Sequence, residues 1–456
     1  MLLDILHDTD SYKLSHPKLW EDNVRFVTCY FECRSHEEFA ETVFFGLQYH
    51  LAALTGIFQV ADVLRAAQDR EGLGIPFPVE HWVRMLEDTE GRLPLRIKAV
   101  PEGSVVPTGN VLFLVQNTHP LGRWLPGWIE TILMRTWYPI TVATLSFHVR
   151  RELERYAKVT CDTLDNVPYQ FHDFGARGVS SAESAAIGGA AHLTSFKGTD
   201  TCVALDLLRN FYDGKPGQMG KSIPALEHSI ITAYGMENDG EYRAFDRFLA
   251  QYAKPGSVVA AVSDTYDLWH AIDVLWGQRL KQRIIDGGAI LGIRPDSGDP
   301  VDVVVRALRM LDNRFGSTLN SKGFKVLNHV KVVQGDGIDR KAISEILAAI
   351  TQAGFSLDCI GTFGCGGGLL QKVNRDTLGC AYKLCEVDGR PVGKRPATDL
   401  AKASKFGYTD LVRRDGMWKS VVGKQTDSRL VTVFEDGEIS ALTTLADVRN
   451  RLWGED

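Results

Sequence analysis

The chain has 456 residues, of which 44% are apolar and 24% are charged. These values are ordinary for globular proteins and exclude disorder, collagen and coiled coil for most of the length. The 51 Lys and Arg residues are outnumbered by 57 Asp and Glu residues, which gives a net charge of −6. That balance excludes a broadly basic nucleic-acid binder, but not an anionic small substrate, because a few Lys and Arg residues can hold phosphates within an acidic protein.

No targeting or membrane segment is expected. Acidic residues appear by Asp4, so the first residues do not read as a signal peptide. No apolar run of about 18 residues occurs, and the most apolar region, 124–147, is interrupted by Glu130, Arg135 and Pro139. The eight cysteines form no CxxC pair, which favours reduced thiols over a zinc site. We therefore expect a cytoplasmic protein without a membrane span.

The first 160 residues mix predicted strands and helices. Segments 24–34 and 109–116 are rich in β-branched and aromatic residues, which predicts strands. Segments 41–54 and 129–156 have the periodicity of helices.

After residue 160, short apolar runs alternate with helical segments. Seven runs end in polar, glycine-rich turns: 169–175, 193–200, 223–229, 257–267, 289–299, 330–339 and 357–368. Helical segments between them include 181–192, 267–285, 300–314 and 340–353. This alternation predicts a parallel sheet, and seven repeats predict its closure into an irregular (β/α) barrel.

The alternation stops near Tyr382, and segment 421–433 again indicates a small β-structure. We therefore predict an α/β protein in which both chain ends form one flanking antiparallel-β domain of the α+β type. The predicted ranges are 1–160 for its N-terminal part, 161–385 for the catalytic barrel and 386–456 for its C-terminal part.

The active site of a (β/α) barrel lies at the carboxyl ends of its strands. Here those ends carry His172, Asp173, Arg177, Asp200, Glu227, His228, Asp264, Arg294, Asp296 and Asp336. Each alone could be a turn or helix-cap residue, but seven polar ends together predict one site. Asp264 and Asp296 could also form a glycosidase pair. Arg294 and Ser297, which flank Asp296, fit a ribose beside a phosphate and Mg²⁺ better.

Two glycine-rich segments are candidate phosphate sites. The sequence FGCGGG, 363–368, precedes a predicted helix near Leu369, and free backbone N–H groups there would favour a phosphate, although a flexible turn is the alternative. The sequence DGKPGQMGKS, 213–222, ends like a nucleotide-binding P-loop, but Lys215 stands where that motif requires glycine. We interpret this second segment as a mobile loop.

Ten ordered motifs carry a resemblance to a known family: TDSYKLSH (9–16), YFECR (30–34), ETVFFGLQY (41–49), HDFGARGVSS (172–181), FKGTDT (196–201), PALEHS (224–229), SDTYD (263–267), RPDSGDP (294–300), QGDGID (334–339) and GGGLLQK (366–372). From about residue 8 to about residue 434 the chain closely resembles the nicotinamide phosphoribosyltransferases, which share their type II architecture with nicotinate phosphoribosyltransferases. The resemblance implies that nicotinamide and 5-phosphoribosyl-1-diphosphate form nicotinamide mononucleotide and diphosphate in NAD salvage. It also implies Mg²⁺, ATP as a coupled co-substrate, and a homodimer with shared active sites.

The resemblance assigns roles to residues of the base and ribose sites. Phe174 would stack on the pyridine ring opposite Tyr12 of the partner subunit, and Asp200 would accept a hydrogen bond from the carboxamide. Arg177 and Arg294 would contact the diphosphate or the amide region, and Asp296 would hold the ribose hydroxyls. The 5′-phosphate would be held by Gly335, Asp336, Gly366, Gly367 and Arg375.

The resemblance also implies that ATP phosphorylates His228, which Asp264 would orient. The residues expected to bind ATP or diphosphate are Arg34 of the partner subunit, Glu227, Lys383, Lys394 and Lys402. Asp264 and Asp296 would meet Mg²⁺ through the bound diphosphate. Cys365 departs from the pattern, in which serine is usual, so a hydroxyl contact to phosphate would be lost or weakened.

Two alternatives to this function remain. A nicotinate phosphoribosyltransferase would share the fold, but Asp200 argues against it because a carboxylate repels nicotinate. A non-catalytic signalling or binding protein could also use the fold, and the apparently complete set of charged site residues argues against that.

Overall fold

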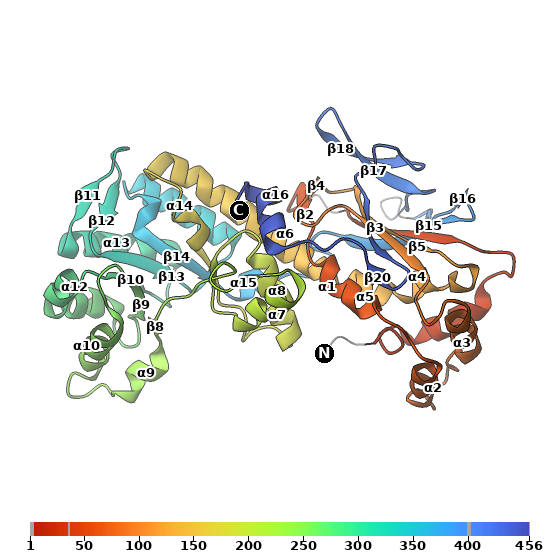
Figure 1. Cartoon of the computed structure of the whole chain (residues 1–456). Helices are drawn as coiled ribbons and strands as arrows, with labels where there is room; N and C mark the ends of the chain where they lie inside the picture. Colours follow the sequence, from red (N-terminus) through yellow and green to blue (C-terminus); the bar gives the residue numbers. More distant parts are fainter. Residues whose placement is uncertain (1–3, 35–36, 399–402, 456) are drawn as a thin grey trace. The chain divides into compact units, whose positions relative to one another are not determined.

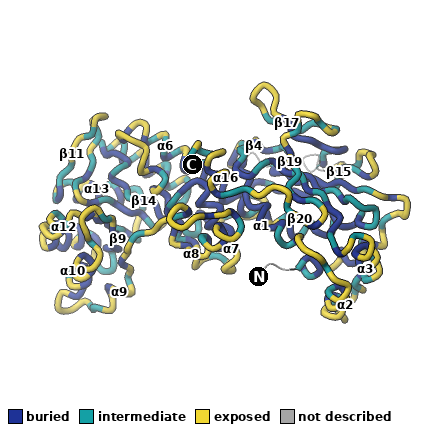
Figure 2. Tube along the Cα trace, viewed as in Figure 1, coloured by how far each residue is buried: buried dark blue, intermediate teal, exposed yellow. Residues whose placement is uncertain are grey.

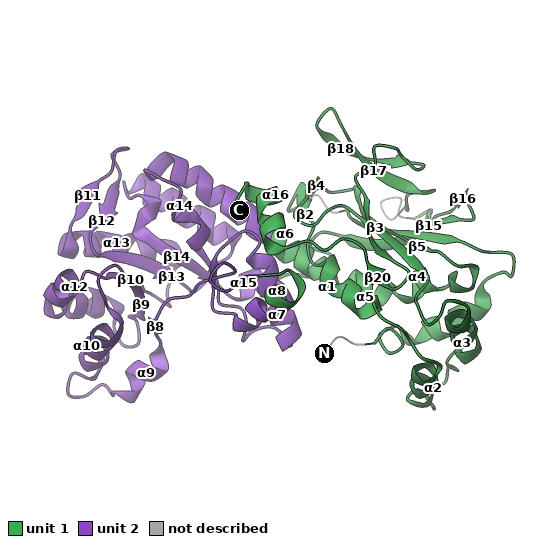
Figure 3. Cartoon of the chain, viewed as in Figure 1, with its two compact units in different colours: residues 1–144, 207–214, 373–456 green, residues 145–206, 215–372 purple. Residues whose placement is uncertain are grey.

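The computed structural model describes residues 4–34, 37–398 and 403–455 and divides the chain into two compact units (Figure 3). Unit 1 comprises Met1–Thr144, Leu207–Gly214 and Val373–Asp456, and unit 2 comprises Leu145–Asp206 and Lys215–Lys372. Helix α6 (Trp137–Thr160) runs from one unit into the other. Residues 373–385, which the sequence places in the predicted barrel range, group with unit 1 because strand β15 pairs with β1 there.

Unit 1 contains a seven-stranded sheet built from both ends of the chain (Figure 1). Its strands are, in spatial order, β16 (Arg390–Pro391), β15 (Cys380–Val387), β1 (Val27–Cys33), β5 (Val111–Asn117), β3 (Leu95–Ala99), β19 (Val431–Glu435) and β20 (Glu438–Ile439). All neighbours pair antiparallel. Every residue of β1 is buried, whereas β3 alternates buried and half-buried residues. The predicted flanking antiparallel sheet from both chain ends is confirmed.

The other elements of unit 1 surround this sheet. They are the hairpin of β17 (Thr409–Arg414) and β18 (Met417–Val422), the pair β2 (Glu41–Val43) and β4 (Val105–Pro107), helices α1 (Leu47–Leu51), α2 (Val60–Gln68), α3 (Val79–Asp88), α4 (Leu125–Trp128), α5 (Glu130–Met134) and α16 (Leu445–Trp453), and the 3₁₀ segments η1 (Ser11–Leu19), η2 (Ala52–Leu54) and η3 (Pro120–Gly122). The predicted helix over 41–54 is wrong at its start. Residues 41–43 pair with β4 instead, and Gly46, at φ 95°, turns the chain into α1.

Unit 2 contains the seven predicted strands in one parallel sheet. Their spatial order is β7 (Gly198–Thr199), β6 (Phe171–Asp173), β14 (Ile360–Cys365), β13 (Val330–Gln334), β10 (Ile290–Arg294), β9 (Val258–Val262) and β8 (Ala225–Leu226). Lys221, just ahead of β8, bridges Gly198 of β7. The sheet therefore curls back toward its own edge, as an irregular barrel does, and the predicted fold class is confirmed.

Helices follow most of these strands. They are α7 (Ala182–His192), α8 (Cys202–Phe211), α9 (His228–Ala233), α10 (Gly240–Tyr252), α11 (Leu268–His270), the π-helix η5 (Ala271–Arg279), α12 (Lys281–Gly287), α13 (Pro300–Phe315), α14 (Arg340–Gln352) and α15 (Gly367–Leu370), with 3₁₀ turns η4 (Val167–Tyr169) and η6 (Leu357–Cys359) and the hairpin β11 (Ser317–Leu319) and β12 (Lys325–Leu327). Asp299 and Asp339 cap α13 and α14 with their side chains. The parallel strands are largely buried, and outer faces of helices such as α10 and α12 are exposed (Figure 2).

None of the helices within the described ranges combines the length and the apolar character needed to cross a membrane.

Candidate active site

The carboxyl ends of the parallel strands in unit 2 hold the charged residues that the sequence singles out. Strand β6 ends at Asp173, β10 ends at Arg294, and Asp200 directly follows β7. Strands β9 and β10 pair from Ile290↔Val258 to Arg294↔Val262, so their carboxyl ends lie level. Because parallel strands present these ends at one edge of the sheet, the charged residues gather there.

The first group, which we call the His172 cluster, consists of His172, Asp200 and Ser222. His172 Nε2 lies 2.9 Å from Asp200 Oδ1, and the Ser222 hydroxyl donates to the same oxygen at 2.6 Å. Partial burial would raise the pKa of Asp200, but His172, Ser222 and the positive charge of Arg294 together hold that pKa below its ordinary value. The cluster therefore presents an ionised carboxylate in a fixed orientation.

Phe174 lies beside this cluster and offers an aromatic face. The Arg294 guanidinium carbon is 5.1 Å from the Phe174 ring centroid, and the His172 and Phe174 ring centroids are 5.3 Å apart. A Cβ at Gly364 would lie 1.9 Å from Phe174 Cε2. Glycine at position 364 therefore makes the space in which the Phe174 ring lies.

The second group, which we call the His228 cluster, consists of His228, Asp264, Thr265 and Asp296. His228 Nδ1 lies 3.0 Å from the Thr265 hydroxyl. His228 Nε2 lies 3.5 Å from Asp296 Oδ2 and 3.7 Å from Asp264 Oδ1, which are distances of ion pairs rather than short hydrogen bonds. The His228 side chain is 45% exposed. A solvent-accessible imidazole thus lies between two carboxylates.

Hydrogen bonds from the β10 turn fix the two carboxylates. Asp264 Oδ2 accepts from the Asp296 backbone N–H at 3.0 Å and from the Ser297 hydroxyl at 2.6 Å. Asp264 Oδ1 is buried and accepts no hydrogen bond from the described residues. Asp296 Oδ1 accepts from Arg294 Nη2 at 2.7 Å. A Cβ at Gly335 would lie 2.8 Å from Arg294 Nε, so glycine there leaves room for the guanidinium.

The remaining predicted residues of unit 2 lie on the adjoining turns. Arg177 and Asp336 are exposed on the loops after β6 and β13. Glu227 precedes α9 and accepts a hydrogen bond from the Ser229 hydroxyl. Gly366 is the N-cap of the four-residue helix α15, which begins at Gly367, slightly earlier than the predicted start near Leu369.

Cys365, which interrupts the glycine run, turns its side chain into the core. Its thiol donates to the Ile338 carbonyl at 3.0 Å, and burial raises the pKa of Cys365 to about 12. The side chain of Cys365 is therefore part of the core, and the loss or weakening of a hydroxyl contact to phosphate at this position stays a prediction.

Several predicted residues belong to unit 1, where cations cluster. Burial lowers the pKa of Lys383, and the negative charge of Glu130 partly opposes this shift. Nearby positive charges lower the pKa of Lys383 further; they belong to Arg34, Lys394 and Arg375. Tyr12 is exposed on η1. Lys402 lies outside the described residues.

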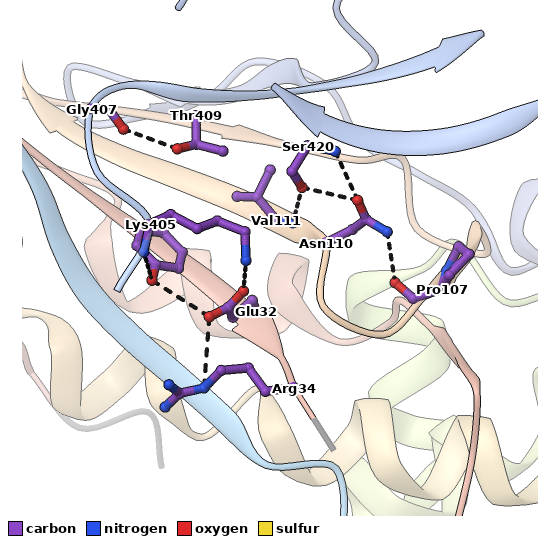
Figure 4. Close-up of polar contacts among 10 residues, drawn as sticks. Glu32, Arg34, Pro107, Asn110, Val111, Lys405, Gly407, Thr409 and Ser420 are labelled. Atoms are coloured by element: carbon purple, nitrogen blue, oxygen red, sulfur yellow. Dashed lines mark hydrogen bonds and ion pairs between the residues drawn. The ribbon is translucent and has the colours of Figure 1, made fainter. Parts of the chain in front are cut away.

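Glu32 anchors one part of this unit 1 cluster. Arg34 Nε lies 3.6 Å from Glu32 Oε1, and Lys405 Nζ donates to Glu32 Oε2, so two cations flank one buried carboxylate (Figure 4). Arg34 Nη1 is buried and has no hydrogen-bond partner among the described residues. Arg34 therefore keeps part of its donor capacity unused.

Ser222 and Lys405 were not predicted as site residues from the sequence, and His172 was predicted at a strand end without a role. Ser222 ends the segment that resembles a P-loop, and its position beside Asp200 depends on the bridge between Lys221 and Gly198. That long-range pairing leaves no local signal. For His172, the available signal was its position at the end of a predicted strand.

His172 and Ser222 also line a cavity of about 330 Å³ that extends along the sheet to Val258 and Lys331.

Within the described ranges, no group of three or more His, Cys, Asp or Glu side chains is arranged to hold a metal ion. Asp264 Oδ1 and Asp296 Oδ2 nevertheless offer two oxygen ligands, which lie 3.7 Å and 3.5 Å from the same atom, His228 Nε2. Two carboxylates fit Mg²⁺ that is held mainly by substrate phosphates and water.

Two family models match the chain. Residues 169–438 match the nicotinate phosphoribosyltransferase (NAPRTase) family, and residues 4–97 match the nicotinamide phosphoribosyltransferase N-terminal domain.

Full-length relatives and solved structures are similar to the chain as well. The nicotinamide phosphoribosyltransferase of Xanthomonas campestris pv. campestris is 45% identical over 98% of this chain and 97% of that protein. The nicotinamide phosphoribosyltransferase of Acinetobacter baylyi is 34% identical over 98% and 96%. Two solved structures share the fold at low identity. The nicotinate-nucleotide pyrophosphorylase from Pyrococcus furiosus has a TM-score of 0.66 at 16% identity and covers 99% of this chain and 95% of its own. Human nicotinic acid phosphoribosyltransferase has a TM-score of 0.58 at 17% identity and covers 99% and 93%.

Proposed function

The chain belongs to the nicotinate phosphoribosyltransferase (NAPRTase) family, and from this membership we propose that it is a nicotinamide phosphoribosyltransferase of NAD biosynthesis. The enzyme transfers the phosphoribosyl group of 5-phosphoribosyl-1-diphosphate to nicotinamide and releases diphosphate. The observation that carries the choice of base is the ionised carboxylate of Asp200, which is hydrogen-bonded to His172, whose ring lies 5.3 Å from the Phe174 ring.

Asp200 distinguishes the two related bases by charge and by hydrogen bonding. Nicotinamide carries two N–H donors on its carboxamide, and one of them can donate to Asp200 Oδ2. Nicotinate carries a carboxylate, which has no donor and is repelled by a second negative charge. A site whose carboxylate accepts a hydrogen bond from its ligand rejects a ligand that lacks the donor, because that acceptor is left unpaired. Phe174 adds a stacking face for the pyridine ring.

The transfer step requires positioning and charge stabilisation rather than a strong base. The pyridine nitrogen attacks C1 of the ribose with its lone pair and has no proton to lose. As the bond from C1 to the diphosphate breaks, positive charge develops on the ribose, and Asp296 is the carboxylate proposed to hold the ribose hydroxyls. Arg294 and Arg177 would stabilise the departing diphosphate. Asp264 and Asp296 are the carboxylates proposed to hold Mg²⁺ through the diphosphate, and the ion would supply further positive charge to that leaving group.

The 5′-phosphate would be held by the turns after β13 and β14. Gly335 and Asp336 follow β13, and Gly366 and Gly367 follow β14. Glycine leaves the backbone N–H groups open to an oxyanion. Arg375 is a further proposed ligand of this phosphate.

ATP coupling through His228 is the second part of the proposal. The His228 side chain is 45% exposed, lies near two carboxylates and is held at Nδ1 by Thr265. This supports a role as the nucleophile that accepts the γ-phosphoryl group at Nε2. In that step the bond between the γ-phosphorus and its bridging oxygen breaks, and ADP leaves. The proposed ligands of ATP and diphosphate are Arg34 of the partner subunit, Glu227, Lys383, Lys394 and Lys402.

Assembly and compartment complete the proposal. We propose a homodimer with shared sites, in which Tyr12 of the partner subunit covers the second face of the base. The exposed ring of Tyr12 in this chain supports that role. The eight cysteines are all free, which supports a cytoplasmic location because such compartments keep thiols reduced.

The test supplies the purified chain with 5-phosphoribosyl-1-diphosphate and Mg²⁺ and offers nicotinamide or nicotinate separately, with and without ATP. Mononucleotide and diphosphate are measured by chromatography. We expect product with nicotinamide and an increase in turnover with ATP. Turnover of nicotinate alone would overturn the assignment of the base, and no turnover of either base would overturn the enzymatic function.

A further inference from the structure

We propose that His172 and Ser222 are positioning residues for base selection: they lock the Asp200 carboxylate so that Oδ1 is occupied and Oδ2 alone is free to accept from the base. The inference rests on the proposed function, and it assigns the selectivity to the whole His172 cluster rather than to Asp200 by itself.

Two donors converge on one oxygen. His172 Nε2 at 2.9 Å and the Ser222 hydroxyl at 2.6 Å both meet Asp200 Oδ1. Oδ2 accepts no hydrogen bond from the residues that the structure describes. Both bonds reach an ionised acceptor and are therefore stronger than bonds between neutral groups. Rotation of the Asp200 side chain would break both, so the carboxylate has one favoured orientation.

The backbone fixes all three residues relative to one another. His172 on β6 pairs with Gly198 on β7, and the Asp200 N–H donates to the Asp173 carbonyl at 3.0 Å. The N–H of Thr199 donates to the Lys221 carbonyl at 3.0 Å, and the N–H of Lys221 donates to the Lys197 carbonyl at 2.7 Å. These bonds hold Ser222, which follows Lys221, beside Asp200. The donors are therefore in place before any ligand binds, as preorganised selectivity requires.

The imidazole of His172 is also fixed from behind. Its side chain is only 10% exposed, whereas half of the Asp200 side chain is exposed. A Cβ at Gly198 would lie 2.7 Å from His172 Nδ1, so the ring lies directly on the backbone of β7. The ring has little freedom to withdraw its Nε2 from Asp200. A carboxylate without these donors would rotate freely. It could then accept a hydrogen bond from water or bind a cation, and the site would tolerate nicotinate.

The experiment measures kcat and KM for nicotinamide and nicotinate in wild type and in the variants His172→Phe, His172→Gln, Ser222→Ala, Asp200→Asn and His172→Phe/Asp200→Asn. His172→Phe removes the donor and keeps a ring, and His172→Gln restores an N–H donor. Ser321→Ala is the matched control, since Ser321 donates to Asp162 at 2.6 Å in the same unit. Thermal melting identifies variants that do not fold.

We expect His172→Phe and Ser222→Ala each to lower the nicotinamide to nicotinate ratio of kcat/KM by about tenfold, mainly through KM for nicotinamide. His172→Gln should recover part of the ratio, and Ser321→Ala should keep it. In the Asp200→Asn background, His172→Phe should change the ratio less than about twofold, because the residue acts through Asp200.

An equal fall of kcat/KM for nicotinamide and nicotinate in His172→Phe would overturn the inference. So would a change in the ratio of the two kcat/KM values that is the same in the wild-type and the Asp200→Asn backgrounds. If His172→Phe does not fold, Ser222→Ala provides the test, because Ser222 is exposed and its replacement should leave folding intact. An unchanged ratio of kcat/KM for nicotinamide and nicotinate in that variant overturns the inference. Wild-type turnover of nicotinamide with unaltered ratios in all variants would leave the proposed function standing and refute only this inference. Failure of wild type to use nicotinamide would refute the proposed function itself.

Discussion

Unit 2 contains two clusters in which a histidine faces a carboxylate, and the two are built differently. In the His172 cluster the imidazole is nearly buried and lies 2.9 Å from Asp200. In the His228 cluster the imidazole is 45% exposed and lies 3.5 Å and 3.7 Å from its two carboxylates. The same pair of residue types thus forms a tight contact in one place and a loose one in the other.

The difference in packing corresponds to a difference in chemistry. A buried histidine with a short hydrogen bond holds a carboxylate still, which suits selection of a ligand. An exposed histidine whose Nε2 has no short hydrogen bond among the described residues can be reached by a reactant, which suits a nucleophile. The variants below separate these roles, because each should affect one cluster and spare the other.

The largest effect is expected for His228→Ala. ATP hydrolysis should fall by about 10³-fold or more, because the proposed nucleophile is absent. Weak transfer to nicotinamide should remain, and the preference for nicotinamide over nicotinate should stay as in wild type. Phosphate release and mononucleotide formation are measured in parallel. The exposed His270 provides a control as His270→Ala. Equal loss of both activities would place His228 in the transfer site instead.

Asp200→Asn should lower the preference for nicotinamide over nicotinate by roughly 10-fold to 100-fold. An amide no longer repels a carboxylate, and the charge-assisted hydrogen bond to the carboxamide is lost. ATP hydrolysis without base should change little. The preference is measured as the ratio of kcat/KM for nicotinamide to kcat/KM for nicotinate. The control is Asp162→Asn, because the Asp162 carboxylate accepts a hydrogen bond from Ser321 outside the site. An unchanged preference would contradict the role of Asp200.

Gly364→Ala should raise KM for nicotinamide by about tenfold with a smaller change in kcat. The new Cβ would lie 1.9 Å from Phe174 Cε2, so the ring must turn away from its present position. Gly127→Ala adds a Cβ with no atom within 4 Å and serves as the control. A normal KM in a folded Gly364→Ala variant would show that the Phe174 ring does not contact the base.

The smallest effect is expected for Cys365→Ser. Its buried side chain donates a hydrogen bond to the Ile338 carbonyl. A hydroxyl can make the same hydrogen bond, so KM for the phosphoribosyl donor should stay within about twofold and stability should change by about 1 kcal/mol or less. A clear fall in that KM would mean that residue 365 does reach the phosphate.

The barrel strands could be predicted from the sequence because each combines a short apolar run with a polar turn, as in 330–339 and 289–299. The helix prediction over 41–54 failed because β2 is only three residues long and is defined by its pairing with β4 rather than by local preference. Local propensity carries little information about such short strands.

Long-range pairing also limited prediction of the site. Ser222 stands in a glycine-rich loop with no motif, and only the bridge from Lys221 to Gly198 brings it to Asp200. Strand-end residues such as Asp200 and Asp296 were found because a parallel sheet places all its carboxyl ends together.

The most direct measurement of the central claim is a competition between the two bases. Equal concentrations of nicotinamide and nicotinate are supplied with limiting 5-phosphoribosyl-1-diphosphate, Mg²⁺ and ATP, and the two mononucleotides are separated and quantified. We predict that nicotinamide mononucleotide is the dominant product. An excess of nicotinate mononucleotide would contradict it.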